Sequence, residues 1–286
     1  MQLSEKHLRL TQSLSGLGSV LVAYSGGTDS AFLAYQAHRV LGDAMLAIIA
    51  DSPSLARTQL ADALAFTSEH GIPVRIIHTD ELDNPEYARN DASRCFHCKD
   101  ELFAEMEKQR LRLGFKHLAY GMNLDDRGDF RPGQKAALLY GAAAPLAEAE
   151  LTKEEIRALA REAGLRIWDK PASACLSSRV EYGMPVTRGV LHRIEEGEEI
   201  LRRMGYRQFR VRSHGELARI EIAVDELPRA LSMQSLQTIA EMFKAIGFKY
   251  VALDCEGYRS GSMNALLPIE AISRAATIGD LRERRS

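Results

Sequence analysis

The sequence has little cysteine, little tryptophan and almost no net charge. Its 286 residues include four Cys and one Trp, and 37 basic residues face 39 acidic ones, which leaves a formal net charge of −2. This balance excludes a global field that would draw the protein to nucleic acid or to an anionic membrane. We therefore expect no nucleic-acid partner, although the count does not exclude local basic patches.

Long apolar runs are also missing. No stretch is long enough to cross a bilayer, and residues 1–10 mix charged and apolar side chains instead of forming the apolar core of a signal peptide. A cytoplasmic protein with no membrane partner is expected. Because the cytoplasm keeps thiols reduced, we interpret the four cysteines as ligands, nucleophiles or core residues and not as a disulfide framework.

Apolar strand-like runs alternate with amphipathic helical stretches in the first part of the chain. The runs cover residues 20–24, 44–50, 74–78 and 117–121, and a fifth strand is expected before Lys170. Helices are expected over 31–41, 55–70 and 99–113, and one more follows a capping box formed by Thr152 and Glu155. This alternation predicts an α/β fold with a doubly wound parallel sheet.

The character of the sequence changes after residue 183. A long charged helix is predicted over residues 191–204 and a second helix over 236–246, with strands at 209–213, 217–224 and 250–253. The chain therefore divides into a first domain of residues 1–183 and a smaller C-terminal α+β domain of residues 184–286.

The strongest motif is the turn Ser25-Gly26-Gly27-Thr28-Asp29-Ser30, which follows an apolar strand and precedes a helix. Both glycines allow a close approach of the backbone to an anion and a positive φ, and N–H groups at the helix start converge on the anion's oxygens. No Gly-Lys-Ser/Thr follows, so this is not the P-loop of kinases. We expect the turn to hold the pyrophosphate of ATP, with Asp29 either near a phosphate-bound Mg²⁺ or capping the helix.

Polar residues follow the other predicted strands, where parallel sheets bind their ligands. Asp51 ends the second strand, at a position suited to the base or ribose of a nucleotide, and Gly121 and Asn123 follow the fourth as further ATP contacts. Asp125 and Asp126 come next, either as partners of a metal such as Mg²⁺ or of an amine, or as helix caps. Arg131 and Lys135 beside a tight turn suit a phosphate-facing loop or a solvated one.

Three of the cysteines suit one metal centre. Cys95 and Cys98 lie within reach of a single metal, and Cys175 follows the expected fifth strand. Three thiolates could hold three irons of a [4Fe–4S] cluster and leave the fourth iron open, or His97 could join them in a zinc site. Cys175 is alternatively a nucleophile or sulfur source, with Arg179 favouring its thiolate. Cys255, behind an apolar strand, is expected to be a small buried residue.

The predicted small domain is rich in arginine around its strands. Arg212 and Arg259 are our candidates for binding a phosphate or carboxylate, the latter in a Gly-rich stretch that continues to Asn264. The other cations of these strands fit either the same site or a solvated face; they are Arg207, Arg210, His214 and Arg219.

These motifs together resemble the LarE family of ATP-dependent sulfur transferases, a branch of the PP-loop ATP pyrophosphatase superfamily. The resemblance rests on four segments: Ser25 to Ser30, Gly121 to Asp126 with Arg131-Pro132-Gly133, Pro171 to Arg179, and Glu256 to Gly261. It implies an adenine nucleotide α-hydrolase-like fold and a role in making the nickel-pincer nucleotide cofactor of lactate racemase. Such proteins activate the carboxylates of pyridinium-3,5-biscarboxylic acid mononucleotide with ATP and convert them to thiocarboxylates, releasing PPi and AMP.

By this similarity Cys175 matches the sulfur-bearing cysteine, and Ser178 and Arg179 join the substrate site. Single-cysteine members give up that sulfur and keep dehydroalanine, whereas Cys95 and Cys98 make this chain similar to the three-cysteine branch, in which a [4Fe–4S] cluster carries the sulfide. The resemblance implies a sulfide or sulfur donor as partner, and we expect a homo-oligomer whose small domain serves sulfur transfer or oligomerisation. Two alternatives remain open: a PP-loop enzyme of tRNA thiolation, and an adenine-nucleotide-binding module without chemistry.

Overall fold

The computed structural model describes residues 2–127, 132–171 and 174–259. The chain forms two compact units, one of Met1–Glu81 with Cys95–Ser173 and the other of Leu82–Arg94 with Ala174–Ser286. The second unit thus takes a short segment from the middle of the first. The division into domains 1–183 and 184–286 stays a prediction, since the units begin and end at other residues.

The first unit is built on a parallel sheet whose strand order is β3-β2-β1-β4. Val20 of β1 pairs with Met45 of β2 and with His117 of β4. The strands are β1 Val20–Ala23, β2 Met45–Asp51, β3 Val74–His78 and β4 His117–Tyr120. The expectation of a fifth strand before Lys170 is wrong, because Arg166–Asp169 forms the 3₁₀ helix η4.

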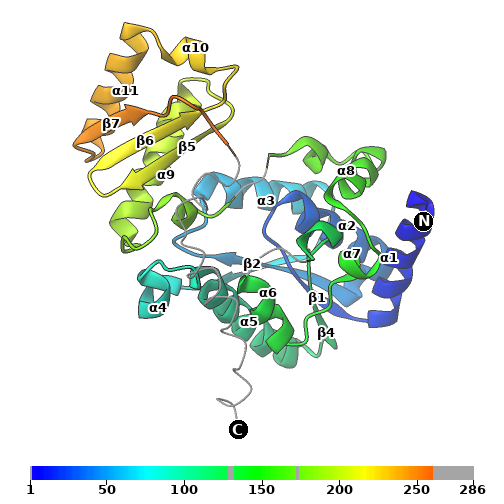
Figure 1. Cartoon of the computed structure of the whole chain (residues 1–286). Coiled ribbons are helices and arrows are strands. Elements are labelled where there is room, and N and C mark those ends of the chain that lie inside the picture. Colours follow the sequence, from blue (N-terminus) through cyan, green and yellow to red (C-terminus); the bar gives the residue numbers. More distant parts are fainter. Residues whose placement is uncertain (1, 128–131, 172–173, 260–286) are drawn as a thin grey trace. The chain divides into compact units, whose positions relative to one another are not determined.

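Helices cover both faces of this sheet. The chain steps from β1 to β2 to β3 in one direction through α2 (Thr28–Leu41) and α3 (Arg57–Glu69), and then returns to β4 through α5 (Arg94–Leu113). Right-handed crossovers place α5 on the face opposite α2 and α3, as Figure 1 shows. The predicted α/β fold with a parallel sheet is confirmed. The other helices of this unit are α1 Leu3–Leu17, η1 Gly42–Ala44, η3 Leu124–Asp126, α6 Pro132–Leu139, α7 Pro145–Glu148 and α8 Lys153–Glu162.

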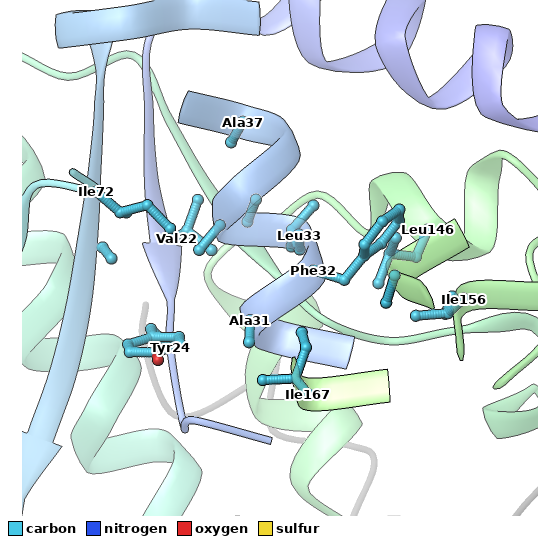
Figure 2. Packing of buried hydrophobic residues seen from close by; sticks show 14 of the residues in the cluster. Val22, Tyr24, Ala31, Phe32, Leu33, Ala37, Ile72, Leu146, Ile156 and Ile167 are labelled. Carbon is cyan, nitrogen blue, oxygen red and sulfur yellow. The ribbon is translucent and has the colours of Figure 1, made fainter. Parts of the chain in front are cut away.

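The core of the first unit lies between the sheet and α2. Val22 of β1 and Phe32 and Leu33 of α2 are completely buried, and Figure 2 shows Phe32 directed toward Leu146 of α7. The central strand β1 is buried over its whole length, and burial on both faces explains why its sequence is a continuous apolar run. In the described part of the chain, no helix has both the length and the hydropathy needed to cross a membrane.

The second unit is a three-stranded mixed sheet with the order β5-β6-β7. The strands β5 (Phe209–His214) and β6 (Leu217–Ile222) form an antiparallel hairpin, and β7 (Tyr250–Leu253) adds parallel to β6 after the crossover helix α11 (Met233–Ala245). In α9 (Arg188–Arg203), Gly197 lets the helix approach Phe243 of α11, where an added Cβ would lie 2.9 Å from the ring. Shorter helices are α4 Pro85–Ala88, η5 Leu176–Arg179 and α10 Leu227–Ala230, while η2 Glu81–Asp83 joins the units.

Candidate functional site

The glycine-rich turn connects β1 to α2 at the carboxyl end of the sheet. Gly26 has φ +72° and lies so close to α3 that an added Cβ would be 2.7 Å from the Cβ of Ala63. Gly27 instead has an extended backbone and is the N-cap residue of α2. The expectation of a positive φ at both glycines is therefore correct for Gly26 and wrong for Gly27. Because Asp29 lies inside the first turn of α2, its expected alternative role as the cap is also wrong.

Hydroxyl groups of the turn hold it in shape. The Oγ atoms of Ser25 and Ser30 lie 3.0 Å apart, and Ser30 Oγ donates to the carbonyl of Gly27 at 3.1 Å. Thr28 Oγ1 donates to the carbonyl of Ile167 at 3.0 Å, which ties the start of α2 to η4. A turn shaped by its own side chains presents the first N–H groups of α2 in one direction, as binding of an anion requires.

The segment after β4 packs directly against the start of α2. An added Cβ at Gly121 would lie 2.9 Å from the nitrogen of Ser30, so this approach needs glycine. Asn123, which is completely buried, donates from Nδ2 to Asp29 Oδ2 at 2.9 Å. Burial raises the pKa of Asp29, with repulsion from Asp126 adding to the effect and the Asn123 hydrogen bond opposing it. The structure thus brings together Asp29, Gly121 and Asn123, three residues expected at the ATP site.

The two acidic residues of η3 have different surroundings. Asp126 is buried and lies 3.2 Å from Lys153 Nζ, so the alternative of an amine partner applies to it. The alternative of an N-cap is wrong for Asp126, because Asn123 is the N-cap residue of η3 and Asp126 lies inside that helix as the third residue of its capping box. Asp125 is exposed and accepts a hydrogen bond from the backbone N–H of Lys153 at 2.8 Å. Asp125 as a ligand of Mg²⁺ stays a prediction. Arg131 lies outside the described residues.

Asp51 ends β2, the strand beside β1, and therefore shares the sheet edge with the turn. Its carboxylate accepts a hydrogen bond from Arg57 Nη1 at 2.6 Å. Nearby, Ser54 donates to Glu81, which is almost fully buried. Glu81 is not among the residues expected at the site, and its place shortly after the end of β3 is the sequence signal that points to it.

Cys95 and Cys98 lie near the start of α5, which begins at Arg94 and not at the predicted residue 99. Side chains three residues apart on a helix are neighbours, and Cys95 is exposed while Cys98 is half-buried. An added Cβ at Gly133 of α6 would lie 3.3 Å from the carbonyl oxygen of Cys95, so α6 packs closely against the start of α5. Within residues 2–127, 132–171 and 174–259, no three His, Cys, Asp or Glu side chains form a metal site.

Cys175 belongs to the second unit and is the N-cap residue of η5. Its side chain is half-buried, and its carbonyl accepts hydrogen bonds from Ser178 Oγ at 2.7 Å and from Arg179 Nη1 at 2.8 Å. Arg179 is buried and pairs with Glu198 at 2.9 Å. The contacts of Arg179 thus fix the backbone around Cys175, and Glu198 balances the charge of the Arg179 guanidinium. The expected effect of Arg179 on the Cys175 thiolate stays a prediction. Cys255 is exposed, so the expectation of a buried residue is wrong.

The arginines of the small sheet are more buried than a solvated face would be. Arg212 is 6% exposed, pairs with the buried Glu221 at 2.8 Å and donates to the carbonyl of Ser178 at 3.2 Å. Arg210 lies over the ring of Tyr258, and burial together with the charge of Arg179 lowers its pKa. The two acidic partners, Glu198 and Glu221, are not among the residues expected at the site, although Glu221 shares a face of β6 with Arg219.

Arg259 is exposed and pairs with Glu256. The rest of its Gly-rich stretch, residues 260–264, lies outside the described residues. Binding of a substrate anion by Arg212 or Arg259 stays a prediction. The two residues differ in one physical respect, since Arg212 is enclosed and Arg259 is open to solvent.

Comparison with known proteins adds to this geometry. The NAD synthase family model matches residues 2–123, which include the glycine-rich turn. A pyridinium-3,5-bisthiocarboxylic acid mononucleotide synthase from Lactiplantibacillus plantarum is 33% identical over 266 residues, 93% of this chain and 96% of that protein. Uncharacterized proteins from Synechocystis and Methanocaldococcus jannaschii are 43% and 30% identical, over 93% and 84% of this chain and 99% and 91% of their own lengths.

Proposed function

Since this chain belongs to the LarE family of ATP-dependent sulfur transferases, we propose that it converts the carboxylates of pyridinium-3,5-biscarboxylic acid mononucleotide to thiocarboxylates. The product would serve nickel-pincer nucleotide synthesis. One observation carries the proposal: the same chain holds a PP-loop turn supported by Asp29 and Asn123 and a half-buried cysteine, Cys175, fixed in a hydrogen-bonded loop. The first feature suits activation by ATP, and the second suits sulfur transfer.

The first step is adenylylation. A carboxylate oxygen of the substrate attacks the α-phosphorus of ATP, the P–O bond to the β-phosphate breaks, and PPi leaves from the turn at Ser25 to Ser30. N–H groups at the start of α2 stabilise the charge that develops on the leaving group. Asp29 and Asp125 would hold a Mg²⁺ ion bound to the phosphates, and Asp51 would bind the nucleoside end. Mg²⁺ supplies charge neutralisation when bound.

The second step is acyl substitution by sulfur. A free carboxylate resists attack because oxide would have to leave, whereas the acyl-adenylate loses AMP. In the sacrificial form, the thiolate of Cys175 attacks the carbonyl carbon, AMP leaves, and a base removes the Cα proton of Cys175. The Cβ–S bond then breaks, which releases the thiocarboxylate and leaves dehydroalanine. Ser178, Arg179, Arg212 and Arg259 are the proposed substrate-binding residues.

In the catalytic form, the three thiolates would hold a [4Fe–4S] cluster, which would supply the sulfide that forms the C–S bond and displaces AMP from the acyl-adenylate, and Cys175 keeps its sulfur. Cys95 and Cys98 fit such a group, since two thiols on one helical turn can bind neighbouring irons. Cys175 would be the third ligand. The presence of this thiol pair favours the catalytic form, with an external sulfide or sulfur donor and a reducing, cytoplasmic setting.

We further propose that residues 1–183 carry the ATP chemistry and that 184–286 serve sulfur transfer and assembly of a homo-oligomer. The decisive experiment adds ATP and Mg²⁺ to the purified chain with and without the pyridinium nucleotide, and measures PPi, AMP and thiocarboxylate. Formation of all three only when the nucleotide is present is expected. Release of PPi with tRNA instead would support a tRNA-thiolating enzyme, and ATP binding without any PPi would leave a nucleotide-binding module.

Intact mass after the reaction separates the two forms of sulfur transfer. When inorganic sulfide is supplied, an unchanged mass with many turnovers is expected if the cluster carries the sulfide. Loss of one H₂S per chain, mapped to Cys175, would instead show that the cysteine itself is the donor.

A further inference from the structure

A short segment of the first part of the sequence packs with the second unit. Leu82–Arg94 leaves the first unit after β3 and returns to it at Cys95. Within the second unit it lies against the loop that carries Cys175, because the N–H of Gly183 donates to the carbonyl of Asn90 at 3.1 Å and that of Val186 to Ala88 at 2.9 Å. The segment Leu82–Arg94 therefore supports the structure of the second unit.

Arg94 is the central contact of the segment. Its side chain is 4% exposed, and Nη1 donates to the carbonyl oxygen of Ser177 at 2.8 Å and also to Asn90 Oδ1. The guanidinium lies over the ring of Tyr182 at 5.5 Å. Ser177 is two residues after Cys175, so this buried cation holds the loop beside the proposed sulfur-bearing cysteine.

Two further residues of the segment hold the same loop. Asn90 is completely buried in a left-handed conformation with φ +60°, and its Nδ2 donates to the carbonyls of Glu181 and Met184 at 2.8 and 2.9 Å. Asparagine tolerates this conformation better than most residues do. The hydroxyl of Tyr87 lies 2.6 Å from Ser177 Oγ, and both residues are almost fully buried. The loop is thus fixed at Ser177, Glu181 and Met184 from one side.

We propose that Tyr87, Asn90 and Arg94 are positioning residues for the sulfur chemistry of Cys175, and we name them the loop clamp. They act through Ser177 and the carbonyls that follow it, not by touching the substrate. Arg94 also directly precedes Cys95 in the chain, so the residue that holds the Cys175 loop is covalently joined to the thiol pair of α5. This inference rests on the proposed function, because it assigns the sulfur chemistry to Cys175.

The first test measures the reactivity of Cys175 in the full-length, metal-free, reduced protein. Pulse alkylation with iodoacetamide, followed by peptide mass mapping, gives the rate at Cys175 relative to exposed Cys255 in the same molecule. Arg94→Met removes the charge and the hydrogen bonds and should raise this relative rate about tenfold, the size expected for loss of one buried charged hydrogen bond. Arg89→Met, in the same segment but exposed, should leave it unchanged.

If Arg94→Met does not fold, Tyr87→Phe tests the clamp in its place. This variant removes one hydroxyl group and should also raise the relative alkylation rate of Cys175, by a smaller factor. A folded Arg94→Met protein, or failing that a folded Tyr87→Phe protein, with the wild-type rate at Cys175 would overturn the proposal.

The second test separates positioning from general damage. With ATP and the pyridinium nucleotide both saturating, so that weaker substrate binding by Ser178 and Arg179 does not limit the rate, PPi release in Arg94→Met should stay near the wild-type value. Thiocarboxylate formation should fall about tenfold, because the clamp holds the Cys175 loop and not the ATP turn. Arg94→Lys keeps the charge and one donor, so it should recover part of the thiocarboxylate yield. An equal loss of both half-reactions would contradict a positioning role. If the wild-type chain itself releases no PPi, the proposed function fails, while the alkylation result still decides whether the clamp holds the loop.

Discussion

Asn123 Nδ2 lies 2.9 Å from Asp29 Oδ2 and joins the segment after β4 to the first turn of α2. Asn123 is completely buried, so this hydrogen bond is screened from water. It keeps the carboxylate of Asp29 in one orientation beside the glycine-rich turn. Burial of this carboxylate costs stability, however, since it raises the pKa of Asp29 and so disfavours the ionised form; the hydrogen bond from Asn123 offsets part of that effect.

Asp29→Asn should make the protein more stable and less active at neutral pH. The amide oxygen of the new side chain can still accept from Asn123, while the cost of burying a charge disappears. Loss of the anionic ligand for Mg²⁺ should reduce substrate-dependent PPi release on the order of a hundredfold. The urea midpoint and the initial rate of PPi release measure the two effects.

The gain in stability should depend on pH with a definite sign. The pKa of Asp29 is raised in the folded state. The contribution of this carboxyl group to the free energy of unfolding is therefore fully present below the unfolded-state pKa and is lost as pH rises through the folded-state pKa. The stability difference between Asp29→Asn and wild type should therefore be small in acid and reach its full size above the raised pKa. A difference that grows toward acid pH would contradict this account.

Gly121→Ala should disrupt the ATP turn through the backbone. The added Cβ would lie 2.9 Å from the nitrogen and 3.0 Å from the Cα of Ser30, and neither atom can move without shifting α2. We expect a loss of about 1–3 kcal/mol in the free energy of unfolding, together with a fall in PPi release. Gly16→Ala in α1 is the control, because nothing lies within 4 Å of its added Cβ and alanine favours helix. Equal stability of the two variants would show that the close approach is tolerated.

The first part of the fold could be predicted because its signals are local. Buried parallel strands are continuous apolar runs, and the Thr152–Glu155 capping box appears in the structure as expected. Gly26 could be identified for the same reason. The tight turn after β1 needs a positive φ, and glycine adopts that conformation far more readily than other residues do.

Other features depend on long-range packing and left no comparable signal. The start of α5 at Arg94 carries no capping box and no clear apolar periodicity in the sequence, so the sequence does not place Cys95 and Cys98 on a helix. The exchange of Leu82–Arg94 between units and the partner of Arg212 are set by residues distant in sequence. The sequence predicts that Arg212 binds an anion of the substrate, and it gives no sign that the carboxylate of Glu221 on the neighbouring strand already pairs with this arginine.

Arg212→Met and Arg259→Met should differ in their effects on stability. Arg212 is buried together with Glu221. Removal of the arginine leaves the Glu221 carboxylate buried without its main partner, which lowers the free energy of unfolding. Since Arg219 also lies 3.3 Å from Glu221 and keeps part of the compensation, we expect a loss of roughly 3 kcal/mol, at the lower end for such pairs. Arg259 is exposed, so its variant should keep the wild-type urea midpoint and, if it binds the substrate anion, raise KM. An Arg212→Met protein as stable as wild type would show that the pair contributes nothing.

The thiol pair of α5 gives the last prediction. Protein purified without oxygen should be brown and contain iron and sulfide, and Cys95→Ala and Cys98→Ala should each lose the colour, because each removes one of three thiolate ligands. Cys255→Ala is the matched control, since Cys255 is also exposed but lies after β7, away from the α5 turn in the sequence. Iron and sulfide assays should be paired with PPi release, which the cysteine variants should retain because they leave the ATP turn intact. A colourless, iron-free wild type that completes many turnovers would eliminate the cluster, and a single turnover with loss of H₂S from Cys175 would assign the sulfur to that side chain.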